Sequence, residues 1–203
     1  GGAPAPGVVP DGTLFPLGET LITYILTDVQ GNSITQSFTI TIVDTQVPVI
    51  LSCPTDVTAT TDVGECDYTY TPHITSAMVM DNCNPYDSLM IRYRVANPDQ
   101  SESGWRLNNT PYDFDVGISQ VLYVVVDKSG NFTECIQQIT VTDNQAPTIT
   151  CNTLAASYPN TTGMCGYVVN GTQFDPLTID DNCGVLSITH NFGDWANPSS
   201  LAG

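Results

Sequence analysis

Short runs in which apolar side chains alternate with threonine or other polar side chains recur along the chain. The run at residues 37–42 alternates strictly, which is the pattern of a half-buried β-strand. A more apolar run at 21–27 precedes it, and turn-forming residues lie between the two. The same arrangement returns at 121–126 and 136–142. These patterns predict β-hairpins. Further strands are expected at residues 57–60, 68–71 and 90–95.

The chain contains an internal repeat with a period of about 99 residues. The segments that return at this offset, within one residue, are Asp28 as Asp127, Gly31-Asn32 as Gly130-Asn131, Asp44 as Asp143, Cys53 as Cys151, Cys66 as Cys165, and Asp81-Asn82-Cys83 as Asp181-Asn182-Cys183. The repeat divides the chain into three units. Residues 1–44 form the C-terminal part of a first repeat, 45–143 a complete repeat, and 144–203 the N-terminal part of a third. We therefore expect the chain to be a segment of a longer array.

Each complete unit holds about seven short strands, which is typical of an immunoglobulin-like β-sandwich. The expected fold class is therefore all-β, with tandem sandwiches of about 99 residues. The Cys–Trp–Cys pattern of antibody domains is absent, because Trp105 lies in an irregular stretch. A partial sandwich exposes sheet edges, so 1–44 and 144–203 are expected to be poorly stable in isolation.

The charge and the cysteines narrow the function. Four basic and 21 acidic residues give a net charge of −17, which opposes binding to nucleic acid and docking on anionic lipid. No apolar run is long enough for a transmembrane helix. Seven cysteines without a CxxC pair favour disulfides, and so an extracellular or cell-surface location. The common hydrolase and nucleotide-binding motifs are also absent, and we expect no enzymatic activity.

The order of motifs in the complete repeat resembles the HYR (hyalin repeat) module. The residues that carry the resemblance are Pro48, Cys53-Pro54, Gly64, Cys66, Asp81-Asn82-Cys83, Phe114, Gly117, Asp127, Gly130-Asn131, Cys135 and Asp143. The resemblance implies an extracellular immunoglobulin-like domain, used in tandem in adhesion and surface proteins and without catalytic chemistry. The chain departs from the module at three places: Asn152 follows Cys151 in place of proline, Gln36 stands where the complete repeat has Cys135, and residues 84–113 are longer than usual.

The resemblance also implies a disulfide pairing. Some members keep only the positions of Cys53 and Cys135, which implies that these two pair. Cys66 would then pair with Cys83 and Cys165 with Cys183, which leaves Cys151 without a partner in this chain. The alternative is that the cysteines are free and buried as small apolar side chains. A catalytic cysteine would need a nearby histidine, and nothing in the sequence ties His73 or His190 to a cysteine.

Acidic residues are expected to gather at one end of each sandwich, where the first strand starts, the second ends and the last hairpin turns. At this end the complete repeat has Asp44, Asp81, Asn82, Asp127 and Asn131, and the third repeat has Asp143, Asn144, Asp180 and Asp181. Crowded carboxylates repel, and a calcium ion with oxygen ligands would relieve that repulsion. The alternative is that these Asp and Asn side chains only cap turns. The sequence leaves both open.

The aromatic residues of the long loop also bear on function. Trp105 and Tyr112 lie in or beside a long loop and are either a sugar-contacting surface or packing for that loop.

The leading hypothesis is a structural segment of a long secreted or surface-anchored adhesin, whose partners are neighbouring repeats and surface glycans or proteins. A ligand-binding module and an accessory domain of a secreted enzyme are the alternatives. The composition resembles large adhesins of gliding or biofilm-forming Bacteroidota, and a eukaryotic matrix protein is the other reading.

Overall fold

The computed structural model describes residues 7–155 and 157–190, so the outermost parts of both partial repeats lie outside it. The strands are β1 (Gly18–Thr27), β2 (Ser33–Ile42), β3 (Val49–Ile50), β4 (Val57–Thr60), β5 (Asp67–Tyr70), β6 (Val79–Met80), β7 (Met90–Ala96), β8 (Arg106–Leu107), β9 (Tyr112–Asp115), β10 (Gly117–Val126), β11 (Phe132–Thr142), β12 (Thr148–Thr150) and β13 (Thr178–Asp180), with a 3-10 helix η1 (Tyr86–Ser88). The expected all-β class is confirmed. Within the described ranges, no helix is long and apolar enough to cross a membrane.

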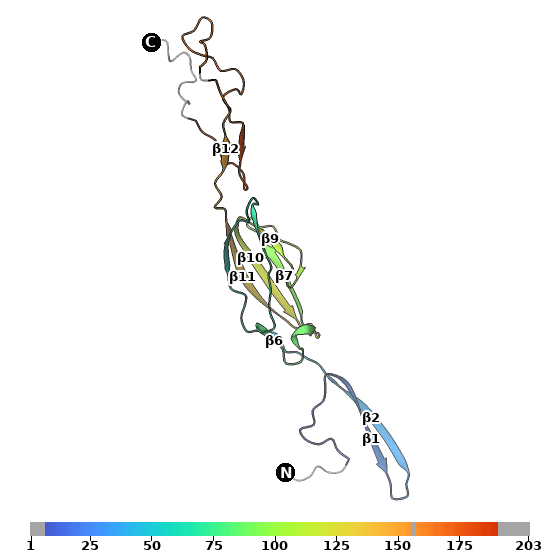
Figure 1. Cartoon of the computed structure of the whole chain (residues 1–203). Helices are drawn as coiled ribbons and strands as arrows, with labels where there is room; N and C mark the ends of the chain where they lie inside the picture. The colour runs from blue at the N-terminus through green and yellow to red at the C-terminus, as the bar shows by residue number, and fades with distance from the viewer. Residues whose placement is uncertain (1–6, 156, 191–203) are drawn as a thin grey trace.

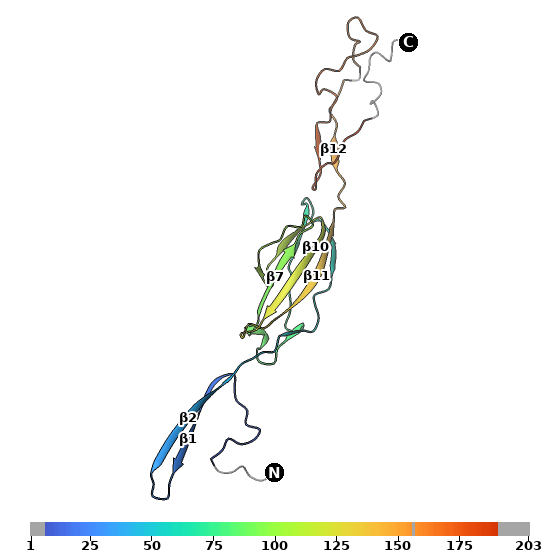
Figure 2. The ribbon, with the colours of Figure 1, turned by 180° about the vertical axis from the view of Figure 1, so that it is seen from behind.

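The central part of the chain is a β-sandwich. Its main sheet has the order β4-β11-β10-β7-β8, with β4 parallel to β11 and the other pairs antiparallel. The short pairs β3–β6 and β5–β9 contribute side chains to the same core. Figures 1 and 2 show the sandwich in the middle of an elongated molecule, with the β1–β2 hairpin at one end and β12 at the other.

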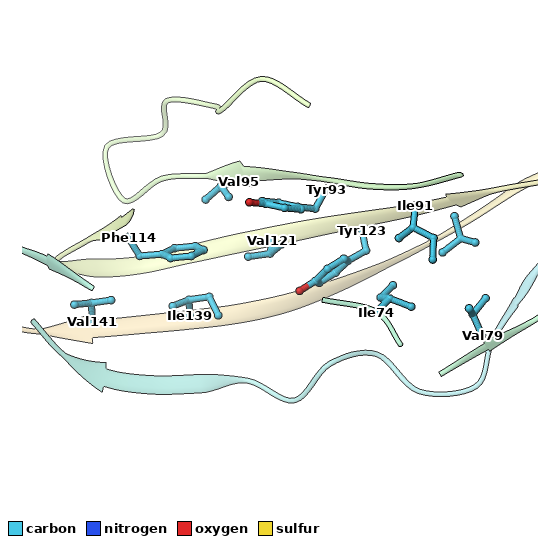
Figure 3. Close-up of a cluster of buried hydrophobic side chains, with 11 residues drawn as sticks. Ile74, Val79, Ile91, Tyr93, Val95, Phe114, Val121, Tyr123, Ile139 and Val141 are labelled. Carbon is cyan, nitrogen blue, oxygen red and sulfur yellow. The ribbon is translucent and has the colours of Figure 1, made fainter. Parts of the chain in front are cut away.

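The core follows from the alternation of side chains along the long strands. Val121, Tyr123 and Val125 of β10 point to one face and are fully buried, as Ile139 of β11 is. The ring of Tyr93 on β7 packs against that of Tyr123, with 6.2 Å between the centroids. Figure 3 shows Tyr93, Val121, Tyr123 and Ile139 in one continuous layer. The apolar periodicity of the sequence therefore decides which face of the sheet is covered.

One polar side chain, that of Gln137, is fully buried in this layer. Its amide nitrogen donates to the carbonyl of Thr55 at 2.6 Å, and its carbonyl accepts from the Tyr123 hydroxyl at 2.7 Å. Burial of its ring raises the pKa of Tyr123. Because its partners come from distant segments, Gln137 ties the strand-free stretch before β4 to the centre of the sheet.

The repeat is visible in the pairing of the strands. Gly18 faces Ile42 in the β1–β2 hairpin, and Gly117 faces Val141 in β10–β11 at the same register. In the same way, β12 pairs with β13 as β3 pairs with β6. The β1–β2 hairpin lacks the second layer, however, and Tyr24 is 38 % exposed where its counterpart Tyr123 is fully buried. The domain boundaries at 44 and 143 stay a prediction.

The long stretch 84–113 is ordered by two anchors. The Asn108 side chain accepts a hydrogen bond from the Ile74 amide and donates one to the Ile74 carbonyl, at 2.8 and 2.9 Å. At the start of β10, Gly117 has φ of +129°, and its Cα faces Pro98 so closely that a Cβ would lie 2.7 Å from the proline ring. Within this stretch β7 pairs antiparallel with β8, and Trp105 directly precedes β8.

Candidate functional site at the two junctions

The end of the sandwich that faces the β1–β2 hairpin is termed the N-terminal junction. Asp44 follows β2, Asp81 follows β6 and Asp127 follows β10, so three separate loops bring carboxylates to one place. The Asn84 amide donates to Asp81 at 2.9 Å and to Asp44 at 3.5 Å. The Asn131 amide donates to the Asp127 carboxylate at 2.7 Å and to the Asp44 carbonyl at 3.2 Å. The structure thus brings these residues together through side-chain amides.

The carboxylates of this junction act as turn caps. Asp81 Oδ1 accepts from the amides of Cys83 and Asn84, at 3.0 and 2.7 Å. Asp127 is buried, which raises its pKa, but the hydrogen bonds from Asn131, Ser129 and Gly130 together outweigh burial and leave the pKa below its usual value. Asn82, by contrast, is exposed, and its amide donates to the Cys83 sulfur at 2.9 Å.

The donor set at this junction fits a cation poorly. Amide N–H groups of Asn84 and Asn131 point at the oxygens that would bind the ion. Across the described part of the chain, no group of three or more His, Cys, Asp or Glu side chains is arranged to hold a metal. One oxygen departs from this picture: Asp81 Oδ2 is buried and has no hydrogen-bond donor. Calcium therefore stays a proposal, resting on that oxygen.

The other end of the sandwich, where it meets residues 144–190, is termed the C-terminal junction. Asp143 Oδ1 accepts from the Gln145 amide and Asp181 Oδ1 from the Cys183 amide, each at 2.9 Å. Asp180 takes part through its backbone, since its carbonyl accepts from the Thr148 hydroxyl at 3.3 Å. Asn144 is exposed beside Asp143. The caps of the N-terminal junction are repeated here.

Two amide side chains hold the C-terminal junction closed against the turn between β4 and β5. Gln145 donates to the Asp62 carbonyl at 3.1 Å and accepts from the Gly64 amide at 3.2 Å. Asn182 donates to the Glu65 carbonyl at 2.8 Å. Because these bonds reach the backbone of the turn, they fix how residues 144–190 leave the sandwich. The sequence assigned no role to Gln145, although Gln145 follows Asp143 by two residues, as Gln46 follows Asp44.

Two disulfides are present. Cys53 is bonded to Cys135, with 6.0 Å between the Cα atoms, as the resemblance implied. This bond lies within the sandwich and joins the segment before β4 to β11.

The second disulfide corrects the expected pairing: Cys66 is bonded to Cys183, not to Cys83. Cys66 lies in the β4–β5 turn at the C-terminal junction, whereas Cys83 lies beside Asp44 at the opposite end. The expected pairing of Cys165 with Cys183 is wrong as well, because Cys183 is bonded to Cys66. Among the described residues, the free cysteines are Cys83, Cys151 and Cys165, all exposed.

A signal against the pairing of Cys66 with Cys83 was present in the sequence. The argument that placed Asp81 and Asn82 at the N-terminal junction also places Cys83 there, far from the turn that carries Cys66. Partial desolvation and the carboxylates of Asp44 and Asp81 raise the pKa of the Cys83 thiol. The acidic surroundings and the free thiol therefore belong to one site.

The third candidate site lies on the outer side of β7 and β8. The guanidinium groups of Arg92 and Arg94 lie 5.2 and 5.5 Å from the Trp105 ring centroid, and that of Arg106 lies 4.8 Å from the Tyr112 ring centroid. These are all the arginines of the chain. Trp105 is 47 % exposed. The five side chains, termed the arginine patch, form a cationic and aromatic surface on an acidic protein.

Comparison with known proteins relates the chain to a named protein. The chain is 30 % identical to hyalin of Lytechinus variegatus over 147 residues, and 31 % identical to hyalin of Strongylocentrotus purpuratus over 149 residues. Each match covers 69 % of this chain. The chain is a distant relative of hyalin. The resemblance drawn from the motifs is thereby confirmed.

The relationship to hyalin covers a part of those proteins. The matched regions make up 24 % and 11 % of the two hyalins, so the chain spans far less than their full length. No family model matches the chain. The matches to hyalin name neither a catalytic activity nor a metal.

Proposed function

We propose that this chain is a non-catalytic structural segment of an extracellular adhesive protein, in which consecutive sandwiches are joined through covalently closed junctions. The observation that carries the proposal is the Cys66–Cys183 disulfide, which links the complete repeat to the segment that follows it. Gln145 and Asn182 support the same contact with hydrogen bonds to the β4–β5 turn. Neighbouring repeats are therefore the first partners of each sandwich.

An extracellular location accords with three observations. The relatives are hyalins, the described cysteines include two bonded pairs, and the net charge is −17. Disulfides persist in oxidising compartments, and a strong negative charge keeps a long array soluble. An array of such segments would hold an adhesive surface at a distance from the cell surface to which the array is attached. A bacterial source and a eukaryotic source both stay predictions.

Small-angle X-ray scattering tests the junction. The oxidised chain is compared with the Cys66→Ser/Cys183→Ser variant, with Cys151→Ser as the matched control. We expect the double variant to sample more bent arrangements, with a smaller mean radius of gyration and a broader distribution of distances, because only the hydrogen bonds of Gln145 and Asn182 then hold the junction. Identical curves for all three proteins would contradict a junction that sets the geometry of the array.

Calcium is proposed as a second stabiliser of the N-terminal junction, since Asp81 Oδ2 is a buried oxygen without a donor. Thermal unfolding with calcium and with chelator, disulfides intact, tests it. A melting temperature restored by calcium but not by magnesium, and insensitive to calcium in Asp81→Asn, would support the ion. Equal melting temperatures in calcium and chelator would reduce Asp44, Asp81 and Asp127 to turn caps.

The arginine patch favours a second candidate function, the binding of an acidic glycan. Guanidinium groups pair with sulfate and carboxylate groups, and an exposed indole stacks on sugar rings. The test measures the fluorescence of Trp105 while the protein is titrated with dextran sulfate or with uncharged dextran. Trp195, the other tryptophan of the chain, is replaced by Phe so that Trp105 alone reports. We expect a change with the sulfated polymer only, lost in Arg94→Ala and kept in Lys128→Ala. An equal response of both variants would contradict recognition by the patch.

A further inference from the structure

The two arginines that contact Trp105 differ in their counter-charges. The guanidinium groups of Arg92 and Arg94 both lie within 5.5 Å of the centre of its indole ring. The Arg94 Nη1 atom is 2.9 Å from Glu102 Oε2, and this ion pair offsets the charge of Arg94. Arg92 has no ion pair or hydrogen bond among the described residues, and its Nε–H group is buried without an acceptor. The arginine patch therefore holds one cation that is open and one that is occupied.

Alternation along β7 places both arginines on the outer face of the main sheet. Tyr93 and Val95 of the same strand point into the core and are fully buried, whereas Arg92 and Arg94 are half-buried. Side chains two residues apart on a strand project in the same direction, about 7 Å from each other. Two cations at this separation can bind two neighbouring anionic groups of one ligand.

The backbone holds Glu102 beside β7. Glu102 pairs with Ala96 in an isolated antiparallel bridge. The next residue, Ser103, donates its amide to the Val95 carbonyl at 2.8 Å, and its hydroxyl accepts from the Val95 amide at 2.8 Å. These contacts fix the backbone of Glu102 next to Arg94. The Glu102 side chain is 53 % exposed, so its carboxylate can leave Arg94 by rotation of the side chain alone.

The ion pair between Arg94 and Glu102 is of a kind that an anionic ligand can replace. Both side chains are more than one-third exposed, and exposed pairs are weak because water and salt screen them. The contact joins one guanidinium nitrogen to one carboxylate oxygen. A guanidinium can hold an oxyanion by two parallel hydrogen bonds, which is a stronger arrangement. A sulfate or carboxylate group of a ligand can therefore take the place of Glu102.

We infer that Glu102 is a built-in competitor in the arginine patch. Its carboxylate occupies on Arg94 the place of a ligand's second anionic group, whereas Arg92 receives the first. This inference rests on the proposed binding of an acidic glycan and deepens it. The ligand class becomes a polyanion whose anionic groups lie about 7 Å apart. A sparsely charged polymer engages Arg92 alone and leaves Glu102 on Arg94.

The test compares Glu102→Gln with the parent chain by the fluorescence of Trp105, both in the Trp195→Phe background. Glutamine keeps the length of the side chain and the backbone bridge to Ala96 but carries no charge. We expect the variant to bind densely sulfated dextran roughly two- to fivefold more tightly, which is the range of one exposed ion pair. Damage to the loop would weaken binding, so a gain separates competition from a structural effect.

Glu134→Gln is the matched control. Glu134 is exposed on β11, and strand pairing places it in one row with Val124 and Arg92 on the outer face. The variant removes the same charge from the same face, two strands from Arg92. Two strand spacings are about 10 Å, which exceeds the Debye length of about 8 Å in 0.15 M salt. We therefore expect the affinity of this variant for the polymer to stay nearly unchanged.

Sparsely sulfated dextran provides the second comparison. Because it leaves Glu102 on Arg94, we expect Glu102→Gln to raise its affinity much less than that of the dense polymer. Equal gains for both polymers, or for Glu102→Gln and Glu134→Gln, would show that net charge alone acts and would overturn the inference.

The remaining outcomes separate the inference from the function on which it rests. A parent chain that binds the dense polymer as tightly as Glu102→Gln refutes the competitor and leaves glycan binding intact. Binding by Glu102→Gln alone supports the competitor. If neither protein binds the dense polymer, the acidic-glycan function fails and the inference fails with it.

Discussion

Cys66 and Cys183 are 117 residues apart in sequence, yet their Cα atoms lie 4.7 Å apart and their sulfurs are bonded. The bond crosses from the central sandwich to residues 144–190. Cys53 and Cys135, by contrast, are bonded within one sandwich. One disulfide thus lies within the sandwich, and the other joins the sandwich to the segment that follows it.

The pairing fixes the number of free thiols. In denaturant without reductant, we expect an alkylating reagent to label three cysteines: Cys83, Cys151 and Cys165. Pairing inside each repeat would leave Cys151 alone. Intact mass after alkylation distinguishes three labels from one, and a count of one would restore the pairing that the resemblance implied.

The buried hydrogen bond between Tyr123 and Gln137 should contribute measurably to stability. Tyr123→Phe leaves the Gln137 carbonyl in the core without this donor, so we expect unfolding to become easier by about 1–3 kcal/mol. Tyr24→Phe is the matched control, since Tyr24 occupies the same place in the open β1–β2 hairpin, and its effect should stay within about 0.5 kcal/mol. Urea unfolding of the oxidised chain gives both values. Equal effects would show that burial does not decide the cost.

The contact between Gly117 and Pro98 makes a second matched pair. Gly117→Ala would place a Cβ 2.7 Å from the proline ring at a positive φ, and we expect a loss of about 1–3 kcal/mol. Gly18→Ala, at the equivalent position, has a positive φ but open space, and should leave the melting temperature of the sandwich nearly unchanged. A similar drop for both variants would assign the effect to backbone strain rather than to the proline.

The reactivity of Cys83 should respond to its acidic neighbours. Desolvation and the charges of Asp44, Asp81 and Asp127 raise its pKa, so less thiolate is present at a given pH. Asp44→Asn removes one charge but keeps an oxygen that can cap Gln46. We therefore expect the pH at half-maximal alkylation of Cys83 to fall in this variant. An unchanged or higher midpoint would contradict the electrostatic contribution.

The repetitive parts of the fold were predictable from the sequence because local patterns decide them. The alternation at 136–142 and the turn at Asp127 lead directly to β10–β11, and the repeat places β1–β2 at the same register. The short strands β3, β6 and β8 were not found, since two residues carry no periodicity. Gln137 was also missed, because a polar residue in a strand gives no sign that distant partners will satisfy it.

The candidate site was predictable in part. Topology placed Asp44, Asp81 and Asp127 together, since strand ends at one edge of a sandwich meet. The amides of Asn84 and Asn131, which take up the carboxylate oxygens, could not be foreseen, because their orientation depends on tertiary contacts. The bond between Cys66 and Cys183 required knowing how one repeat sits on the next. No spacing within a single repeat contains that information.

The position of the Cys66–Cys183 bond also determines how the chain would respond to a pulling force applied at its two ends. The shortest covalent path passes from residue 66 to residue 183 through the two sulfurs, so residues 67–182 lie outside it. Tension would then reach the β10–β11 pairing only after a sulfur–sulfur bond had broken. A chain built in this way resists extension through covalent bonds and keeps most of its length in reserve until it is reduced.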